Sequence, residues 1–132
     1  MTTGRRHRYQ PSYCEENVWW LCQEPEIARS RPWVIFVSNA DRRCAFLEQR
    51  AARVGEVVIW DYHVVLLVAA TSGARIWDLD SRLPLPVSLA RYLRATFPEL
   101  PPELASLAPR FRLLTAEELL AHLSSDRSHM RV

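Results

Sequence analysis

Two apolar runs joined by a short polar turn constrain the fold of this chain more than any other feature. The first run spans residues 57–68 (VVIWDYHVVLLV), and the second spans residues 75–79 (RIWDL). Between them, Thr71, Ser72 and Gly73 have the side-chain chemistry of a tight turn. The pattern predicts one long strand that returns as the second strand of an antiparallel hairpin.

The segments around the hairpin predict helices and shorter strands. Helices are expected at about residues 13–23, 88–97 and 115–123, a helical turn near 103–107, and strands at 33–37 and 111–114. Pro25 and Pro32 bracket a connection, and Pro84 and Pro86 are expected to end the hairpin ladder. Residues 42–53 fit either a strand or a short helix. The predicted fold class is α+β, an α/β sandwich in which helices flank a mainly antiparallel sheet.

Composition excludes several classes of protein. A hydrophobic share of 48% in 132 residues supports one core, and a net charge of +2 gives no sign of a nucleic-acid partner. No apolar run is long enough to span a membrane, and no signal-peptide pattern begins the chain. We therefore expect a cytoplasmic monomer with no nucleic-acid or membrane partner, built as a flexible lead-in (residues 1–11) and a single domain (residues 12–132).

The three cysteines are too few for a disulfide framework, and they have different expected roles. Ser12 and Glu15 have the spacing of a capping box, which makes Cys14 the second residue of a helix. A thiol there lies among free backbone N–H groups at the positive end of the helix dipole, which favours a nucleophilic thiolate. A buried structural cysteine explains the same local pattern. Cys22 and Cys44 are expected to fill apolar space, and no zinc-binding spacing is present.

Polar residues interrupt the apolar hairpin and indicate a site. A histidine within an apolar strand is either bonded to a core neighbour or functional, and both readings of His63 remain open. A two-residue turn would place His63 opposite Asp80 and diagonal to Asp78, whereas a three-residue turn would place both acids on the other face. Asp61 shares the face of His63 in the predicted strand. Residues 61, 63, 78 and 80 therefore form one polar group only in the first register.

In that register the residues have the types and the order of contacts that a thiol enzyme requires. A Cys14 thiolate needs an imidazole to form an ion pair and to protonate a leaving group, and His63 needs a carboxylate to fix its orientation. Backbone N–H groups at the helix start could hold an oxyanion, often worth ~3 kcal/mol per donor. This arrangement resembles that of papain-like and transglutaminase-like thiol enzymes.

Longer blocks of sequence resemble the protein N-terminal glutamine amidohydrolase family. They lie in family order at residues 13–19 (YCEENVW), 58–67 (VIWDYHVVLL), 77–80 (WDLD) and 125–130 (SDRSHM), with further similarity at 36–39 (FVSN) and 83–86 (LPLP). The resemblance implies a thiol amidohydrolase that converts the N-terminal Gln of proteins or peptides to Glu and releases ammonia, upstream of an N-degron pathway in eukaryotes. It implies a papain-like or transglutaminase-like core and no metal or organic cofactor.

The resemblance also implies roles for individual residues. Cys14 would be the nucleophile, His63 the general base and acid, and Asp78, rather than Asp80, the orienting acid. Family members continue past the SDRSHM block, so the domain is expected to lack the family's C-terminal part. Two other functions remain open: a broader transglutaminase-like thiol hydrolase or acyltransferase that acts on internal Gln, and an inactive peptide-binding module.

Selection of an N-terminal residue requires a partner for its α-ammonium group. Glu16, Asp61 and Asp80 are candidates for this partner, although a solvated or structural role fits each of them equally well. Asp126 and His129 follow the expected end of the last helix and could line the pocket. A self-contained polar turn is the alternative reading of that segment. His122 is expected at the surface.

Overall fold

The protein is built on a five-stranded antiparallel sheet with helices on both faces. The computed structural model describes the backbone of residues 14–130 and the side chains of residues 14–123. In chain order its elements are α1 (Cys14–Cys22), α2 (Pro25–Arg29), β1 (Trp33–Ser38), β2 (Cys44–Phe46), β3 (Val58–Trp60), β4 (His63–Ala70), β5 (Gly73–Trp77), β6 (Val87–Ser88), α3 (Leu89–Thr96), the 3-10 helix η1 (Pro102–Leu107), β7 (Arg110–Thr115) and α4 (Ala116–Met130).

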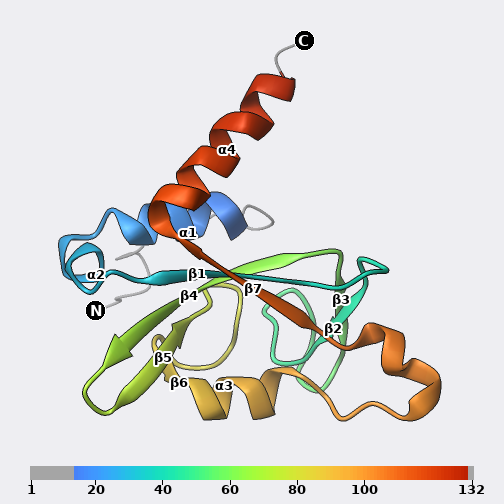
Figure 1. The fold of residues 1–132 in the computed structure, drawn as a ribbon. Coiled ribbons are helices and arrows are strands. Elements are labelled where there is room, and N and C mark those ends of the chain that lie inside the picture. Colours follow the sequence, from blue (N-terminus) through green and yellow to red (C-terminus); the bar gives the residue numbers. More distant parts are fainter. Residues whose placement is uncertain (1–13, 131–132) are drawn as a thin grey trace.

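The main sheet has the strand order β6-β5-β4-β1-β7, and β2 pairs with β3 in a separate two-stranded sheet. Helices α1 and α4 lie on one face of the main sheet, and α3 lies on the other (Figure 1). The predicted α+β class, with helices flanking a mainly antiparallel sheet, is therefore confirmed.

Alternating side chains of the central strands fill two apolar cores, one on each face. Val34 and Val64 belong to the core on the α1 and α4 side. Ile35, Val65 and Tyr92 belong to the core on the α3 side. Because neighbouring residues of one strand point to opposite faces, the central strands can be apolar throughout, as their sequence is.

The prediction of one long strand over residues 57–68 is wrong, because the chain leaves one sheet and enters the other at Asp61 and Tyr62. The Asp61 carboxylate accepts the Tyr62 backbone N–H at 2.8 Å, and the Ser38 hydroxyl donates to the Asp61 carbonyl at 2.8 Å. A side chain that binds the next backbone N–H competes with ladder hydrogen bonding. The strand therefore breaks there, and His63 becomes the first residue of β4.

The hairpin itself has the two-residue turn. Ala70 pairs with Gly73 and Leu66 with Trp77, which leaves Thr71 and Ser72 as the loop. Gly73 has φ +120°, a backbone conformation that residues with a side chain rarely adopt. Of the two registers left open by the sequence, the structure therefore has the first. This register places His63 beside Asp78 and Asp80, which follow β5.

Two short elements differ from expectation, and a third resolves a choice that the sequence left open. Residues 25–29 form the short helix α2, with Pro25 in its first turn, where a missing N–H costs nothing. Within the ambiguous residues 42–53, β2 is a strand and Cys44 is fully buried, as expected of an apolar filler. Beyond Pro84 and Pro86 the ladder resumes, because β6 pairs with β5.

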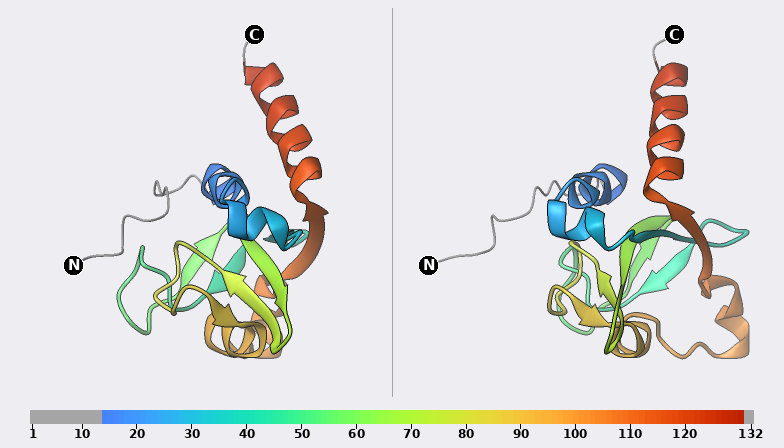
Figure 2. Two further views of the ribbon diagram at one scale, coloured as in Figure 1. Left: turned by 90° about the vertical axis from the view of Figure 1, so that its left-hand side faces the viewer. Right: turned by 60° about the vertical axis from the view of Figure 1, so that its left-hand side comes forward.

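The last helix is longer than predicted. Thr115 and Glu118 form the expected capping box, with reciprocal bonds of 3.1 and 2.8 Å, but α4 continues to Met130 rather than ending near Leu123. Its far half projects away from the sheet (Figure 2). Asp126 and His129 therefore lie within a helix and do not follow one. Among the described helices, none combines the length and apolar character that crossing a bilayer requires.

Candidate active site

Three elements bring the predicted nucleophile, base and acid together at one end of the sheet. Cys14 is the first described residue of α1, His63 begins β4, and Asp78 directly follows β5. The thiol-bearing residue is partly exposed, whereas His63 and Asp78 are 2% and 1% exposed. Ser12, the expected N-cap, lies outside the described residues.

His63 lies between the other two side chains. Its Nε2 atom is 2.9 Å from Asp78 Oδ1, and the Cys14 side chain lies within hydrogen-bonding reach of the ring. Because Nε2 is occupied by the carboxylate, Nδ1 is the ring atom that remains for the thiol. The contacts form a chain from sulfur to imidazole to carboxylate.

Two hydrogen-bond donors in addition to His63 hold the Asp78 carboxylate. The Asp80 backbone N–H donates to Asp78 Oδ1 at 3.0 Å, and the Tyr92 hydroxyl donates to Oδ2 at 2.7 Å. Burial would raise the pKa of the Asp78 carboxyl, but the charge of His63 and these hydrogen bonds hold the pKa below its ordinary value. Asp78 is therefore a buried carboxylate with a fixed orientation.

Aromatic rings surround the imidazole. Trp60 stacks on His63, with ring centroids 5.6 Å apart and planes 9° apart, and Phe46 meets it edge-on at 5.3 Å. The Trp60 indole N–H donates to Gln49 Oε1 at 3.1 Å, which fixes the stacked ring. An indole face favours a cationic imidazole.

The protonation of His63 follows from these neighbours. Burial alone would lower the pKa of His63, but the charge of Asp78 and its hydrogen bond, together with Cys14, raise that pKa well above the ordinary value of 6.5. An imidazolium held by a carboxylate can give a proton to a leaving group, which is the role that a thiol enzyme requires of its histidine.

This pair predicts how stability depends on pH. The Asp78 pKa falls on folding, so its stabilisation is lost as the pH drops below 3.8, the ordinary value. The His63 pKa rises on folding, so its stabilisation is complete below 6.5 and is lost as the pH rises through the folded value. We expect the unfolding free energy to decline toward alkaline pH in the wild type and much less in His63→Gln. Urea unfolding across pH measures this, and equal declines would contradict it.

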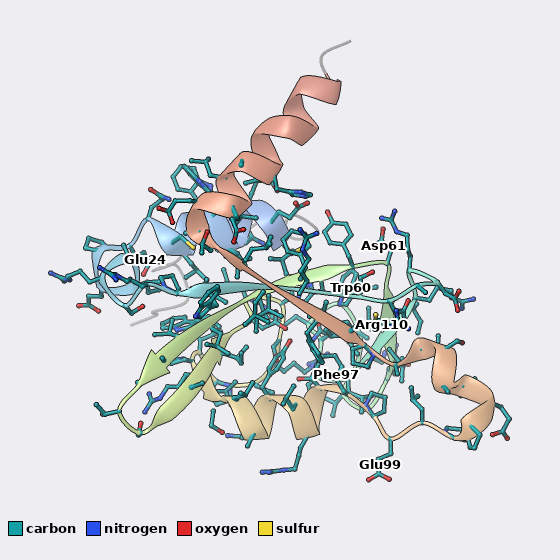
Figure 3. All side chains as sticks on the ribbon, in the orientation of Figure 1. Glu24, Trp60, Asp61, Phe97, Glu99 and Arg110 are labelled. Atoms are coloured by element: carbon teal, nitrogen blue, oxygen red, sulfur yellow. The ribbon has the colours of Figure 1, made fainter. Side chains whose placement is uncertain are left out.

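The predicted substrate-binding residues are scattered. The Asp80 Oδ2 atom lies 3.9 Å from His63 Nε2, so Asp80 belongs to the site. Asp61 is exposed at the β3–β4 junction, beside Trp60 in Figure 3, and its carboxylate faces Arg42 at 3.8 Å. The expectation that Asp61 joins the polar group is therefore wrong, because the strand break turns it outward. Glu16 is partly exposed on α1.

The side chains of Asp126 and His129 lie outside the described residues. Sequence reasoning missed Trp60, Gln49 and Tyr92 as site neighbours. Trp60 precedes His63 by three residues and was visible in the sequence, but Tyr92 comes from α3 and nothing local links it to Asp78. The Tyr92 pKa is raised by burial and by the Asp78 charge, which keeps its hydroxyl protonated as a donor.

His63, Asp78 and Asp80 are also the one group in the described part of the chain whose ligand atoms could surround a metal ion, all within 4.8 Å. However, the oxygens of Asp78 already accept three hydrogen bonds, from His63, Asp80 and Tyr92. These contacts are those of a carboxylate that orients an imidazole.

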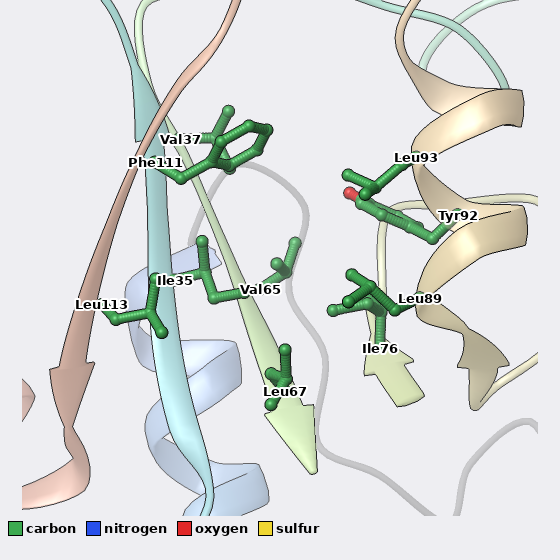
Figure 4. Close-up of a pocket in the computed structure, with 10 residues that line it drawn as sticks. All are labelled: Ile35, Val37, Val65, Leu67, Ile76, Leu89, Tyr92, Leu93, Phe111 and Leu113. Carbon is green, nitrogen blue, oxygen red and sulfur yellow. The ribbon is translucent and has the colours of Figure 1, made fainter. Parts of the chain in front are cut away.

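A separate apolar cavity of about 260 Å³ lies between the sheet and α3 (Figure 4). The Tyr92 ring lines this cavity among aliphatic residues such as Ile35 and Leu89. Neither Cys14 nor His63 lines it. Tyr92 thus contacts both features: its ring lines the apolar cavity, and its hydroxyl donates to the Asp78 carboxylate.

The fold and these contacts define an α+β protein with a cysteine–histidine–aspartate constellation at the end of its sheet. A family model described as N-terminal glutamine amidase matches residues 9–132. This chain therefore belongs to the N-terminal glutamine amidase family, which confirms the resemblance inferred from the sequence blocks.

Curated relatives bear the name "Protein N-terminal glutamine amidohydrolase". The Danio rerio protein is 37% identical over 134 residues, covering 98% of this chain and 66% of that protein. The Arabidopsis thaliana protein is 36% identical over 136 residues (96% and 62%), and the Drosophila ananassae protein is 39% identical over 135 residues (93% and 63%). The chain spans slightly less than two thirds of the length of these relatives.

Proposed function

We propose that this chain carries a thiol amidohydrolase activity that converts the N-terminal Gln of a protein or peptide to Glu and releases ammonia. The observation that supports it best is the contact chain from the Cys14 thiol through His63 to the buried Asp78 carboxylate, in a member of this family. The names of the relatives supply the substrate.

The proposed reaction uses these three side chains in two steps. The Cys14 thiolate attacks the side-chain amide carbon of glutamine, and the His63 imidazolium gives its proton to the departing nitrogen, which leaves as ammonia. Water then attacks the thioester, and His63 takes a proton from that water. The thiolate leaves, the imidazolium forms again, and the product is glutamate. Asp78 keeps the ring oriented throughout.

Recognition of the substrate α-ammonium group requires a carboxylate near the thiol. Asp80 is the best placed of the candidates predicted from sequence, because its side chain lies next to His63 and is 11% exposed. Glu16 is the second candidate. We assign no such role to Asp61, which faces Arg42.

Three further expectations belong to the proposal. The described cysteines are all free, which fits a reducing cytoplasmic compartment. Both apolar cores use the same sheet, which fits one domain from about residue 12. The protein is proposed to act as a monomer on peptide substrates, feeding an N-degron pathway.

A pair of isomeric peptides tests the function. One peptide begins with Gln, and the other carries the same Gln at an internal position; ammonia release is measured for both. We expect release from the first only. Release from both would indicate the broader thiol hydrolase, and release from neither by folded protein would indicate a peptide-binding module. Either result contradicts the proposed specificity.

A further inference from the structure

A buried carboxylate outside the contact chain lies beside the nucleophile. Glu15 directly follows Cys14, and it is only 8% exposed although it is charged. Charged side chains are seldom buried without a partner, because desolvation costs more than burial returns. The position of Glu15 therefore calls for an explanation that the proposed reaction does not supply.

The partner of Glu15 is the residue that precedes His63. The Tyr62 hydroxyl donates to Glu15 Oε1 at 2.5 Å. The pKa of Tyr62 is raised, first by burial and then by the Glu15 hydrogen bond and charge, with the nearby Cys14 contributing. The phenol therefore remains protonated and remains a donor.

A second contact extends this bond to α4. The Glu15 Oε2 atom lies 2.9 Å from His122 Nε2, without an aligned hydrogen bond among the described residues. Phe36 of β1 packs under both partners, stacked on Tyr62 at 6.2 Å and edge-on to His122 at 5.2 Å. Glu15, Phe36, Tyr62 and His122 form the cluster that we call the Glu15 cluster. His122 is exposed at the surface, as expected, and it also takes part in this cluster.

The Glu15–Tyr62 hydrogen bond joins the sequence neighbours of Cys14 and His63. Neighbouring residues share a peptide backbone, so a bond between Glu15 and Tyr62 ties the backbone of Cys14 to that of His63. These two backbones belong to different elements, α1 and β4, and no covalent link holds them in register. A charge-assisted hydrogen bond in a buried setting is short and directional, which suits it to fix such a distance.

We propose that Glu15 and Tyr62 are positioning residues that set the distance and orientation between the Cys14 thiol and the His63 ring. This inference rests on the proposed function for its catalytic consequence, but thiol reactivity reports the positioning independently. Loss of the bond lets the start of α1 move relative to β4. Because a misplacement of about 1 Å can cost on the order of 100-fold in rate, a modest shift has a large effect.

A purely structural role is the alternative. In that case the Glu15–Tyr62 bond holds α1 to the sheet, and its loss lowers stability without changing the thiol. The two roles differ in thiol reactivity, because only positioning alters the contact of Cys14 with the imidazole. They also differ in kinetics, because positioning lowers kcat with KM retained, whereas direct substrate binding would change KM.

Alkylation of Cys14 by iodoacetamide, followed across pH by peptide mass analysis, tests the proposal. Cys22 and Cys44 are buried, and burial raises their pKa values, to about 11 for Cys22, so they are expected to react slowly. The variants are Tyr62→Phe, which removes the donor, Glu15→Ala, which removes the acceptor, and Glu15→Gln, which keeps an acceptor oxygen. Glu26→Ala, an exposed acid in the first turn of α2, is the matched control.

We expect Tyr62→Phe and Glu15→Ala to slow the alkylation of Cys14 by about tenfold or more and to reduce kcat similarly, with KM within about twofold. Glu15→Gln should restore most of the rate, and Glu26→Ala should match the wild type. Adding Tyr62→Phe to Glu15→Ala should cause no further loss, since both remove one bond.

Unchanged alkylation in folded Tyr62→Phe and Glu15→Ala would overturn the inference in favour of a structural role. A change in KM alone would overturn it in favour of substrate binding. If one variant does not fold, the other and the Glu15→Gln rescue still decide the result. Absence of ammonia release from the wild type, with alkylation responding as expected, would refute the proposed function and leave the positioning role in place.

Discussion

Replacing Cys14 by alanine is expected to lower kcat for ammonia release from an N-terminal Gln peptide by a factor of about 10⁴ or more. No other described side chain next to His63 is a comparable nucleophile, so the covalent step has no substitute. The fold should persist, because Cys14 is only partly buried at the first described position of α1. Its truncation is expected to cost less than about 1 kcal/mol of stability.

Cys22→Ala is the matched control for that variant, because it removes a thiol two turns further along the same helix. Cys22 is 6% exposed and belongs to the apolar core. We expect a loss of about 1 kcal/mol in unfolding free energy, with turnover retained. Turnover above one hundredth of the wild-type rate in folded Cys14→Ala would exclude Cys14 as the nucleophile.

Replacing Asp78 by asparagine is expected to affect both turnover and folding. An amide has one acceptor oxygen and one donor nitrogen, whereas Asp78 accepts from His63, from Tyr92 and from a backbone N–H. One donor must then face the amide N–H, and the imidazolium loses its counter-charge. We expect kcat to fall by roughly 10³–10⁴ and the unfolding free energy by about 3 kcal/mol.

Steady-state kinetics and urea unfolding of Asp78→Asn measure both effects. Asp41→Asn, in the exposed turn after β1, removes an equal charge from the surface and should change neither quantity. Asp80→Asn distinguishes the two acids near His63. A greater loss of kcat in Asp80→Asn than in Asp78→Asn would mean that Asp80 orients the imidazole, contrary to the assignment.

The hairpin could be predicted from local rules, but these rules left two registers open. A two-residue turn fixes the pairing of β4 with β5, and that pairing fixes which residues lie level with His63. The same rules allowed a three-residue turn, and only the structure distinguished the two. The long sequence blocks then indicated the family, which turn chemistry alone could not.

The break at Asp61 could not be predicted because it depends on competition between two hydrogen-bonding schemes. Apolar residues on both sides of Asp61 made a continuous strand the simpler reading. The side chain of Asp61 instead binds the next backbone N–H, and Ser38 from another strand binds its carbonyl. The contact between Ser38 and Asp61 joins residues that are distant in sequence, and no local pattern predicts it.

The surroundings of the site show the same limit. Glu15 was read only as the partner of Ser12 in a capping box, whereas its described contacts are with Tyr62 and His122. Tyr92 binds Asp78 from the opposite face of the sheet. The residues that carry chemistry are recognisable by type and motif, but the residues that hold them are defined by tertiary packing.

A covalent trap tests most directly whether Cys14 is the nucleophile for an N-terminal glutamine. In the trap peptide, a diazomethyl ketone replaces the side-chain amide of the N-terminal glutamine, and peptide mass analysis locates the adduct. We predict one equivalent of label on Cys14, in step with loss of ammonia release, and none when the modified residue is internal. Inactivation with the label on another residue, or with Cys14 unmodified, would contradict the assignment.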